Sequence, residues 1–225
     1  MTQREQLWQC ARRDLVLCTP EAREDVFLWE HSRRVAANAV RLASLPEVAT
    51  GGSLDAIALE AAAWYHDSGW AFQYREGEVK RAEILARPTS VHQRELGAKL
   101  LGESLGAHLR GGPLESALNA ILRMNERPSA TPEAQILCDA ESLDEIGNLS
   151  LLAMLRRHAW EGKAIDEAVR TWKSQREFKF WEARINTSFH FEVSRRMAVD
   201  RLARLDQILH EIARLHTGED LEAPT

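Results

Sequence analysis

The stretch that decides the fold is LDAIALEAAAWYHDSGW, residues 54–70. Its apolar residues continue over more than three helical turns, and the small side chains of its alanine run would let neighbouring helices approach closely. The helix is expected to begin after the cap Ser53 and to end at Gly69. His66 and Asp67 would then lie at the end of a buried helix, where both groups are costly to bury unless they are paired or bind a metal ion.

Two other segments carry a ligand-type residue within an apolar pattern. His31 lies in WEHSRRVAANAVRLA (29–43), and apolar residues follow it at spacings of four, eight and eleven. Asp139 lies in AQILCDAESLDEIG (134–147), with apolar residues at spacings of four and seven. A lone histidine on such a face is usually an ordinary core residue. Three separate helices, however, each present a ligand-type side chain on a core-facing surface.

These motifs, in this order, resemble those of the HD-domain superfamily of metal-dependent phosphohydrolases. The resemblance covers about residues 25–150, and it rests on the segments HSRRVA (31–36), AAAWYHDSGW (61–70) and ILCDAESLDEIG (136–147). The C-terminal segments FWEARI (180–185) and FEVSRRMAVDRL (191–202) loosely resemble the helical extension of bacterial HD-domain nucleotide pyrophosphatases. The resemblance implies an all-α fold in which a single HD-domain helical bundle carries a C-terminal helical extension.

The composition independently predicts a helical chain. Ala and Leu supply 59 of the 225 residues, and no alternating apolar and polar stretch has the length of a strand. We expect one domain over 1–218, with its core at about 21–150 and the helical extension at 150–216, followed by a flexible tail at 219–225. The predicted helices are about 3–18, 19–45, 53–69, 90–109, 113–125, 131–146, 148–161, 164–185 and 189–216, with residues 71–89 largely irregular.

The resemblance also implies a metal site. Carried over residue by residue, it assigns one divalent transition-metal ion to His31, His66, Asp67 and Asp139. Two imidazoles and two carboxylates suit Mn, Fe, Co, Ni or Zn without choosing among them. Asp67 is also expected to act in catalysis, as the ligand best placed to accept a hydrogen bond from the attacking water.

His92 is a second catalytic candidate. It begins VHQRELGAKLL (91–101), which looks like the H-x-x-x-x-G-A segment that contributes to a second metal in dinuclear relatives. The later histidine of that arrangement aligns here with Asn125, and amides are poor ligands for such ions. We therefore expect a mononuclear site, with His92 facing the cleft near the metal or a phosphate; the alternative is an exposed histidine near a helix start.

Four further residues are candidates for substrate binding. Arg34 follows His31 by three residues and lies on nearly the same helical face, so it would contact a phosphate or pair with a carboxylate. Lys99 lies seven residues after His92 on one face, although a solvated lysine is the commoner reading. The same applies to Arg184 in FWEARI. Asp144 would hold a ligand histidine or a substrate hydroxyl, or would be a solvated acid.

The resemblance implies a metal-dependent phosphohydrolase that uses metal-activated water to cleave a phosphoester or phosphoanhydride of a small molecule such as a nucleotide. The alternatives are an HD-fold regulatory module that binds metal or nucleotide with little catalysis, an iron-dependent oxygenase, which Asn125 disfavours, and a purely structural helical protein. The sequence leaves the oligomeric state open.

The formal charge of −5 argues against a nucleic-acid polymer as partner, and no apolar run of about 18 residues suggests a membrane span. The start, MTQREQLWQCARRD, lacks the apolar region of a signal peptide. We therefore expect a cytoplasmic protein with free thiols at Cys10, Cys18 and Cys138.

Overall fold

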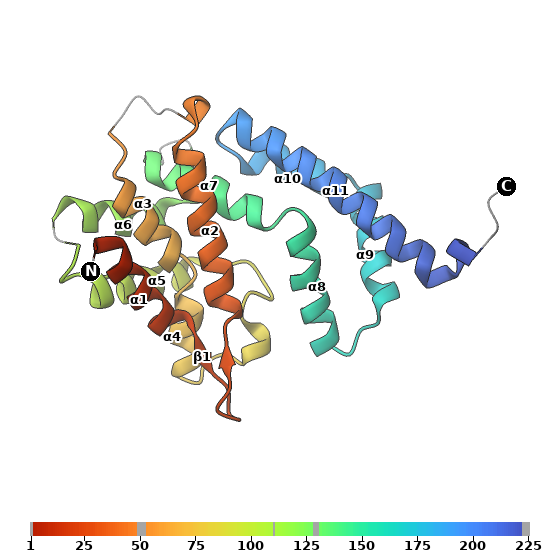
Figure 1. Ribbon diagram of the computed structural model, residues 1–225, viewed down its shortest axis with the longest axis horizontal. Helices are drawn as coiled ribbons and strands as arrows, with labels where there is room; N and C mark the ends of the chain where they lie inside the picture. Colours follow the sequence, from red (N-terminus) through yellow and green to blue (C-terminus); the bar gives the residue numbers. More distant parts are fainter. Residues whose placement is uncertain (1, 49–52, 110, 128–130, 222–225) are drawn as a thin grey trace. The chain divides into compact units, whose positions relative to one another are not determined.

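The computed structural model describes residues 2–48, 53–109, 111–127 and 131–221. It divides into two compact units, Met1–Glu141 and Ser142–Thr225. The predicted all-α fold is confirmed, since the described residues outside helices form only loops and one small hairpin (Figure 1). The first unit contains α1 (Gln3–Leu15), β1 (Leu17–Cys18), β2 (Glu24–Asp25), α2 (Phe27–Ala43), η1 (Pro46–Val48), α3 (Ala56–Tyr65), α4 (Gly69–Arg75), η2 (Arg81–Glu83), α5 (Val91–Leu105), α6 (Gly112–Arg123) and the start of α7 (Pro132–Asp144).

The N-terminal segment differs from its prediction. Helix α1 ends at Leu15 rather than near Cys18, and β1 pairs with β2 in an antiparallel hairpin. The turn contains Ala22, whose φ of 56° is left-handed and whose N–H donates to the carbonyl of Thr19 at 2.9 Å. Residues 20–23 of the turn are all exposed, so a helix there would have no face to bury. Thr19 therefore caps no helix, and α2 begins only at Phe27.

Helix α3 is the centre of the first unit. It packs against α2 and α6, and every residue of its alanine run, Ala61 to Ala63, is fully buried. Its cap is Asp55 rather than the predicted Ser53, because Asp55 Oδ1 accepts hydrogen bonds from the N–H groups of Ile57 and Ala58 at 3.1 and 3.0 Å. The small alanine side chains thus allow close packing on several faces, as the sequence predicted.

The segment after α3 is more regular than expected. Gly69 begins α4 instead of closing α3. The position needs glycine because an added Cβ would lie 2.0 Å from the carbonyl oxygen of Gln93. Gly97 on α5 makes a similar contact, because its Cβ would lie 2.8 Å from the Tyr65 carbonyl oxygen. The two glycines let the backbone of α5 lie directly against the turn between α3 and α4. Ser90 caps α5 as predicted, in a capping box with Gln93.

The second unit completes α7 and contains α8 (Asn148–Trp160), α9 (Ile165–Glu177), α10 (Phe180–Ser188), α11 (Glu192–Thr217) and η3 (Glu219–Leu221). The prediction of a single helix over 164–185 is wrong. The chain breaks at Lys179, whose φ of 54° is left-handed, and α9 and α10 pack against each other. The rings of Trp172 and Trp181 lie 5.9 Å apart across this pair. Of the predicted tail, residues 219–221 form η3 and 222–225 lie outside the described residues.

No described helix has both the length and the apolar character needed to cross a bilayer. The three cysteines are free thiols, as predicted, but Cys18 lies on β1 rather than on the helix that carries Cys10.

Candidate metal centre

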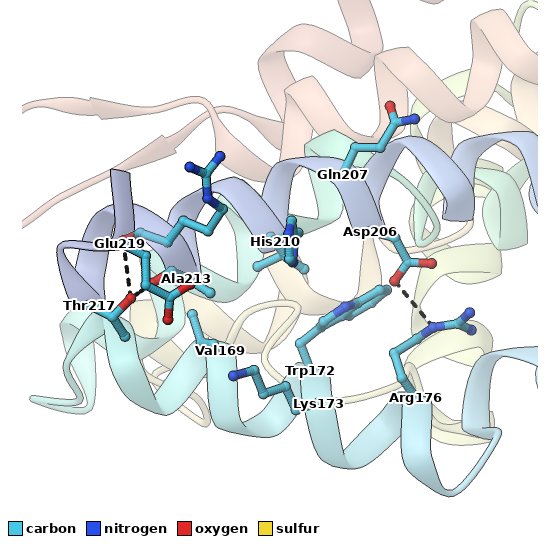
Figure 2. Close-up of a pocket in the computed structure, with 12 residues that line it drawn as sticks. Val169, Trp172, Lys173, Arg176, Asp206, Gln207, His210, Ala213, Thr217 and Glu219 are labelled. Carbon is cyan, nitrogen blue, oxygen red and sulfur yellow. Dashed lines mark hydrogen bonds and ion pairs between the residues drawn. The ribbon is translucent and has the colours of Figure 1, made fainter. Parts of the chain in front are cut away.

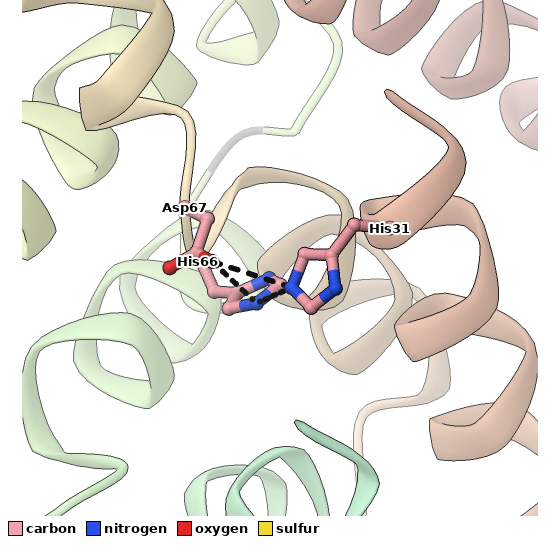
Figure 3. A group of neighbouring side chains, drawn as sticks. All are labelled: His31, His66 and Asp67. Atoms are coloured by element: carbon pink, nitrogen blue, oxygen red, sulfur yellow. Dashed lines mark hydrogen bonds and ion pairs between the residues drawn. The ribbon is translucent and has the colours of Figure 1, made fainter. Parts of the chain in front are cut away.

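Three side chains from two helices meet inside the first unit. His31 lies on α2, His66 is the C-cap of α3, and Asp67 follows it; their exposed fractions are 8%, 0% and 2%. His31 Nε2 lies 3.3 Å from His66 Nε2 and 3.3 Å from Asp67 Oδ2, and His66 Nε2 lies 3.5 Å from the same oxygen. Two nitrogens and one oxygen therefore converge, as Figure 3 shows. We call these three residues the His-His-Asp cluster.

The backbone of α3 fixes the ring of His66. Its Nδ1 lies 2.9 Å from the carbonyl oxygen of Ala63, which can only accept a hydrogen bond. Nδ1 must therefore carry a proton, and in the neutral ring Nε2 keeps its lone pair. This is the arrangement found for most histidines that bind metals, whose second ring nitrogen donates to a carbonyl or carboxylate.

Asp67 is oriented by a chain of hydrogen bonds with a fixed direction. The indole Nε1–H of Trp70, which can only donate, gives its hydrogen bond to Thr89 Oγ1 at 3.0 Å. The Thr89 hydroxyl in turn donates to Asp67 Oδ1 at 2.6 Å. One carboxylate oxygen is thus held by Thr89, and the other, Oδ2, faces the two imidazoles.

Asp67 is held in its ionised form. Burial alone would raise its pKa, but the nearby charge of His66, the hydrogen bond and charge of His31, and the Thr89 hydroxyl together hold the pKa well below its usual range. A buried carboxylate that remains ionised is the form that binds a cation.

The cluster fits a transition-metal ion on its donor chemistry. Neutral imidazole nitrogen and carboxylate oxygen are the ligand types preferred by Mn, Fe, Co, Ni and Zn. The spacing also fits, because ligands about 2.0–2.2 Å from one ion at tetrahedral angles lie about 3.3–3.6 Å apart. The three measured separations, 3.3, 3.3 and 3.5 Å, fall in this range.

Helix α7 contributes two acidic residues near these elements. Asp139, the fourth predicted ligand, is fully buried, but its carboxylate is not part of the group that the donor atoms of His31, His66 and Asp67 form within 4.8 Å of one another. Its role as a ligand stays a prediction. Glu141 is half-buried, and its pKa is raised by burial and by the charge of Asp67, while the two imidazoles and Arg94 act in the opposite direction. The Glu141 carboxyl is therefore within electrostatic range of the cluster.

The other predicted residues lie apart from the cluster or are more exposed. His92 is 65% exposed in its side chain, and its Nδ1 lies 3.6 Å from Glu95 Oε2. Lys99 is exposed, with its Nζ 5.1 Å from the ring centre of Phe72. Arg34 is half-buried on α2.

Two predicted residues belong to the second unit. Arg184 forms an ion pair with Glu145. Asp144 is 9% exposed, and its charge opposes the fall in the pKa of Arg201 that burial causes. The substrate-binding roles of Arg184 and Asp144 stay predictions, as does the mononuclear site inferred from Asn125, whose side chain is exposed.

Two residues at the start of α5 were missed in the sequence. Thr89 directly precedes the cap Ser90, so the capping pattern locates it at the end of a loop but does not indicate its contact with Asp67. Arg94 lies one turn into α5 and is only 9% exposed. The close packing of α5 that buries Arg94 depends on Gly69 and Gly97, whose spacing alone does not reveal it.

The second unit has a hollow of its own, between α9 and α11 (Figure 2). Its volume is about 580 Å³, and it is lined by residues that include Val169, Trp172, Lys173, Arg176, Asp206 and His210. Arg176 is already paired there: its Nε lies 3.2 Å from Asp206 Oδ1, and one Nη lies 2.6 Å from Glu182 Oε1. We call this the α9–α11 hollow.

Solved structures with a similar fold come from several bacteria. YpgQ of Bacillus subtilis, in a structure solved with ADP, is 19% identical, with a TM-score of 0.59 over 95% of this chain and 96% of that one. A predicted HD superfamily hydrolase from an uncultured Thermotogales bacterium is 20% identical, with a TM-score of 0.53 over 93% and 90%. A protein of Lactobacillus plantarum is 19% identical, with a TM-score of 0.58 over 96% and 97%.

No curated protein matches the sequence. The sequence profile of the HD domain, however, matches residues 28–146, which is more than half of the chain and includes the whole His-His-Asp cluster. The predicted resemblance is therefore confirmed, and the chain belongs to the HD-domain family.

Proposed function

We propose that this protein is a metal-dependent phosphohydrolase that cleaves a phosphoester or phosphoanhydride bond of a nucleotide. The observation that carries the proposal is the convergence of His31 Nε2, His66 Nε2 and Asp67 Oδ2 within 3.3–3.5 Å of one another. When both rings are in their neutral, metal-binding form, two lone pairs and one anionic oxygen face each other in a low-dielectric interior, and a cation bound between them stabilises this arrangement.

The residues of the chain would hold one divalent ion and orient it. His31, His66 and Asp67 supply three donors, and we propose Asp139 as the fourth, since it is buried on α7 and matches the family motif. A bound ion of this kind supplies Lewis acidity and makes water a nucleophile near neutral pH. Thr89 donates a hydrogen bond to Oδ1 of Asp67, so Oδ2 would be the oxygen that binds the ion. The burial of His31, His66 and Asp67 limits the access of bulk water to the site.

A nucleotide is the favoured substrate class. The structure of YpgQ, which shares the fold over nearly its whole length, was solved with ADP. Nucleotides contain the phosphoanhydride and phosphoester bonds that a metal-assisted hydrolysis of this type would cleave.

The test is a metal and substrate screen of the purified protein. We expect about one transition-metal ion per chain by elemental analysis and metal-dependent release of phosphate or pyrophosphate from at least one nucleotide. Asp67→Ala should abolish both, whereas Arg123→Gln, which changes an exposed residue of α6, should change neither. Full activity and full metal content in the Asp67→Ala protein would rule out the mechanism.

The same screen separates the alternative functions. Tight nucleotide binding with no turnover under any metal would indicate a regulatory HD module. Oxygen consumption by an iron-loaded protein would indicate an oxygenase.

A further inference from the structure

Arg94 is a buried cation beside the His-His-Asp cluster. It lies on α5, it is 9% exposed, and one of its terminal nitrogens donates to the carbonyl oxygen of Thr89 at 2.8 Å. The hydroxyl of the same Thr89 donates to Asp67 Oδ1 at 2.6 Å. The guanidinium is therefore held by the residue that orients a proposed metal ligand.

Within the described part of the chain, the charge of Arg94 lacks a carboxylate at ion-pairing distance. Its one hydrogen bond to the protein uses one of five N–H donors, and its acceptor is a neutral carbonyl. A guanidinium with so little exposure normally has an anionic partner, since an unpaired buried charge is costly. Within the described residues, its Nε and its second terminal nitrogen have no hydrogen-bond partner, and neither atom is fully enclosed by protein.

Thr89 connects Arg94 to the cluster, because its carbonyl accepts from the guanidinium and its hydroxyl donates to Asp67. Among the described residues, Arg94 forms an ion pair with neither Asp67 nor Glu141.

We propose that Arg94 binds a phosphate group of the ligand, placing the oxyanion next to the His-His-Asp cluster. This inference rests on the proposed function for the identity of the ligand, and it names the residue that recognises its anionic part. A guanidinium suits this role because its planar donors match two oxygens of a phosphate at once. Lys99, the cation that the sequence suggested for this helix, is exposed and lies over Phe72, so it is less desolvated than Arg94.

The experiment compares Arg94→Gln and Arg94→Lys with the wild-type protein. Glutamine can still donate to the Thr89 carbonyl but carries no charge, whereas lysine keeps the charge and loses the planar fork. Arg123→Gln serves as the control, because Arg123 is an exposed arginine whose Nε lies 3.9 Å from Glu126 Oε2. Binding of inorganic phosphate and of ADP is measured by calorimetry with metal-loaded and metal-stripped protein, and metal affinity is measured separately.

We expect Arg94→Gln to weaken the binding of phosphate and ADP by about 10- to 100-fold while metal affinity stays within a few-fold of wild type. Arg94→Lys should be intermediate, the control should match wild type, and the loss in Arg94→Gln should shrink at high salt. A role limited to packing would instead lower the melting temperature without this loss of charge-dependent binding.

The proposal is overturned if Arg94→Gln binds both probes within about twofold of wild type, or if wild-type protein binds neither. If Arg94→Gln does not fold, the comparison of Arg94→Lys with wild type decides in the same way. The failure of the proposed function looks different: no nucleotide is hydrolysed, yet the loss of phosphate binding in Arg94→Gln still supports the anion site.

Discussion

The His-His-Asp cluster and the α9–α11 hollow differ in how their charges are balanced. In the hollow, Arg176 is paired with both Asp206 and Glu182 and lies 6.0 Å from the ring centre of Trp172. In the cluster, three donor atoms face one another, and the nearby Arg94 is held by a neutral carbonyl. Open volume alone is therefore a poor guide to function here; groups that the protein buries without completing their interactions are a better one.

The largest difference between the two regions should appear when one histidine of each is removed. His66→Ala removes a fully buried ring whose Nδ1 contacts the Ala63 carbonyl and whose Nε2 faces the rest of the cluster. His210→Ala changes an exposed residue that lines the hollow. We expect His66→Ala to weaken metal affinity by at least about 100-fold and His210→Ala to leave it unchanged. Metal titration by calorimetry measures both. Equal losses, or no loss in either variant, would break the contrast.

The alkylation rates of two cysteine thiols test the difference between buried and exposed surroundings. Burial and the charges of Glu141 and Asp139 raise the pKa of Cys138 to about 11, whereas Cys18 on β1 is exposed. A rise from the ordinary value of 9.0 leaves about 100-fold less thiolate at pH 8 than in an unshifted thiol, and burial also limits access, so iodoacetamide should label Cys138 much more slowly than the exposed Cys18. The rate at Cys138 should rise with pH up to about 11.

Mass spectrometry of the labelled peptides gives both rates, and the urea-unfolded protein is the control in which they should become similar. Comparable rates in the folded protein would show that Cys138 is not enclosed.

Thr89 tests whether the orientation of Asp67 matters, or only its presence. Thr89→Val keeps the shape of the side chain but removes the hydroxyl that donates to Asp67 Oδ1, whereas Thr89→Ser keeps it. We expect metal affinity to fall by about 10- to 100-fold in Thr89→Val and to change little in Thr89→Ser. An unchanged affinity in the valine variant would mean that the two imidazoles alone position the carboxylate.

The smallest expected effect concerns the packing that supports the cluster. Gly97→Ala adds a Cβ 2.8 Å from the Tyr65 carbonyl oxygen, while the matched substitution Gly102→Ala, on the same helix, meets no atom within 4 Å. We expect the first to lower the free energy of unfolding by about 1–3 kcal/mol. The second should raise it by about 0.5–1 kcal/mol because alanine favours helix. Urea unfolding measures both, and equal effects would show that the close contact is not needed.

The sequence was sufficient for the helices whose ends carry strong local signals. Ser90 caps α5, Pro113 lies in the first turn of α6, and α7 starts at Pro132, each as predicted. Prediction from the sequence failed where tertiary contacts or backbone strain determine the local structure. The hairpin at Ala22 and the break at Lys179 both use a left-handed residue that is not glycine, and Gly69 serves close packing rather than helix termination.

The same division applies to the site. His31, His66 and Asp67 could be predicted because apolar periodicity and a motif mark them, and the structure brings their donor atoms together. Thr89 and Arg94 could not, since their importance comes from how closely α5 approaches the turn after α3, which no local pattern encodes.

The hydrogen bond from His66 Nδ1 to Ala63 has a consequence for the energetics of ion capture. The ring is aimed by its own helix, three residues away, and Asp67 is the next residue in the chain. Two of the three donors are therefore preorganised before any ion arrives, so little rotamer entropy is lost when they bind it. An ion held by all three residues would therefore link α2 to α3.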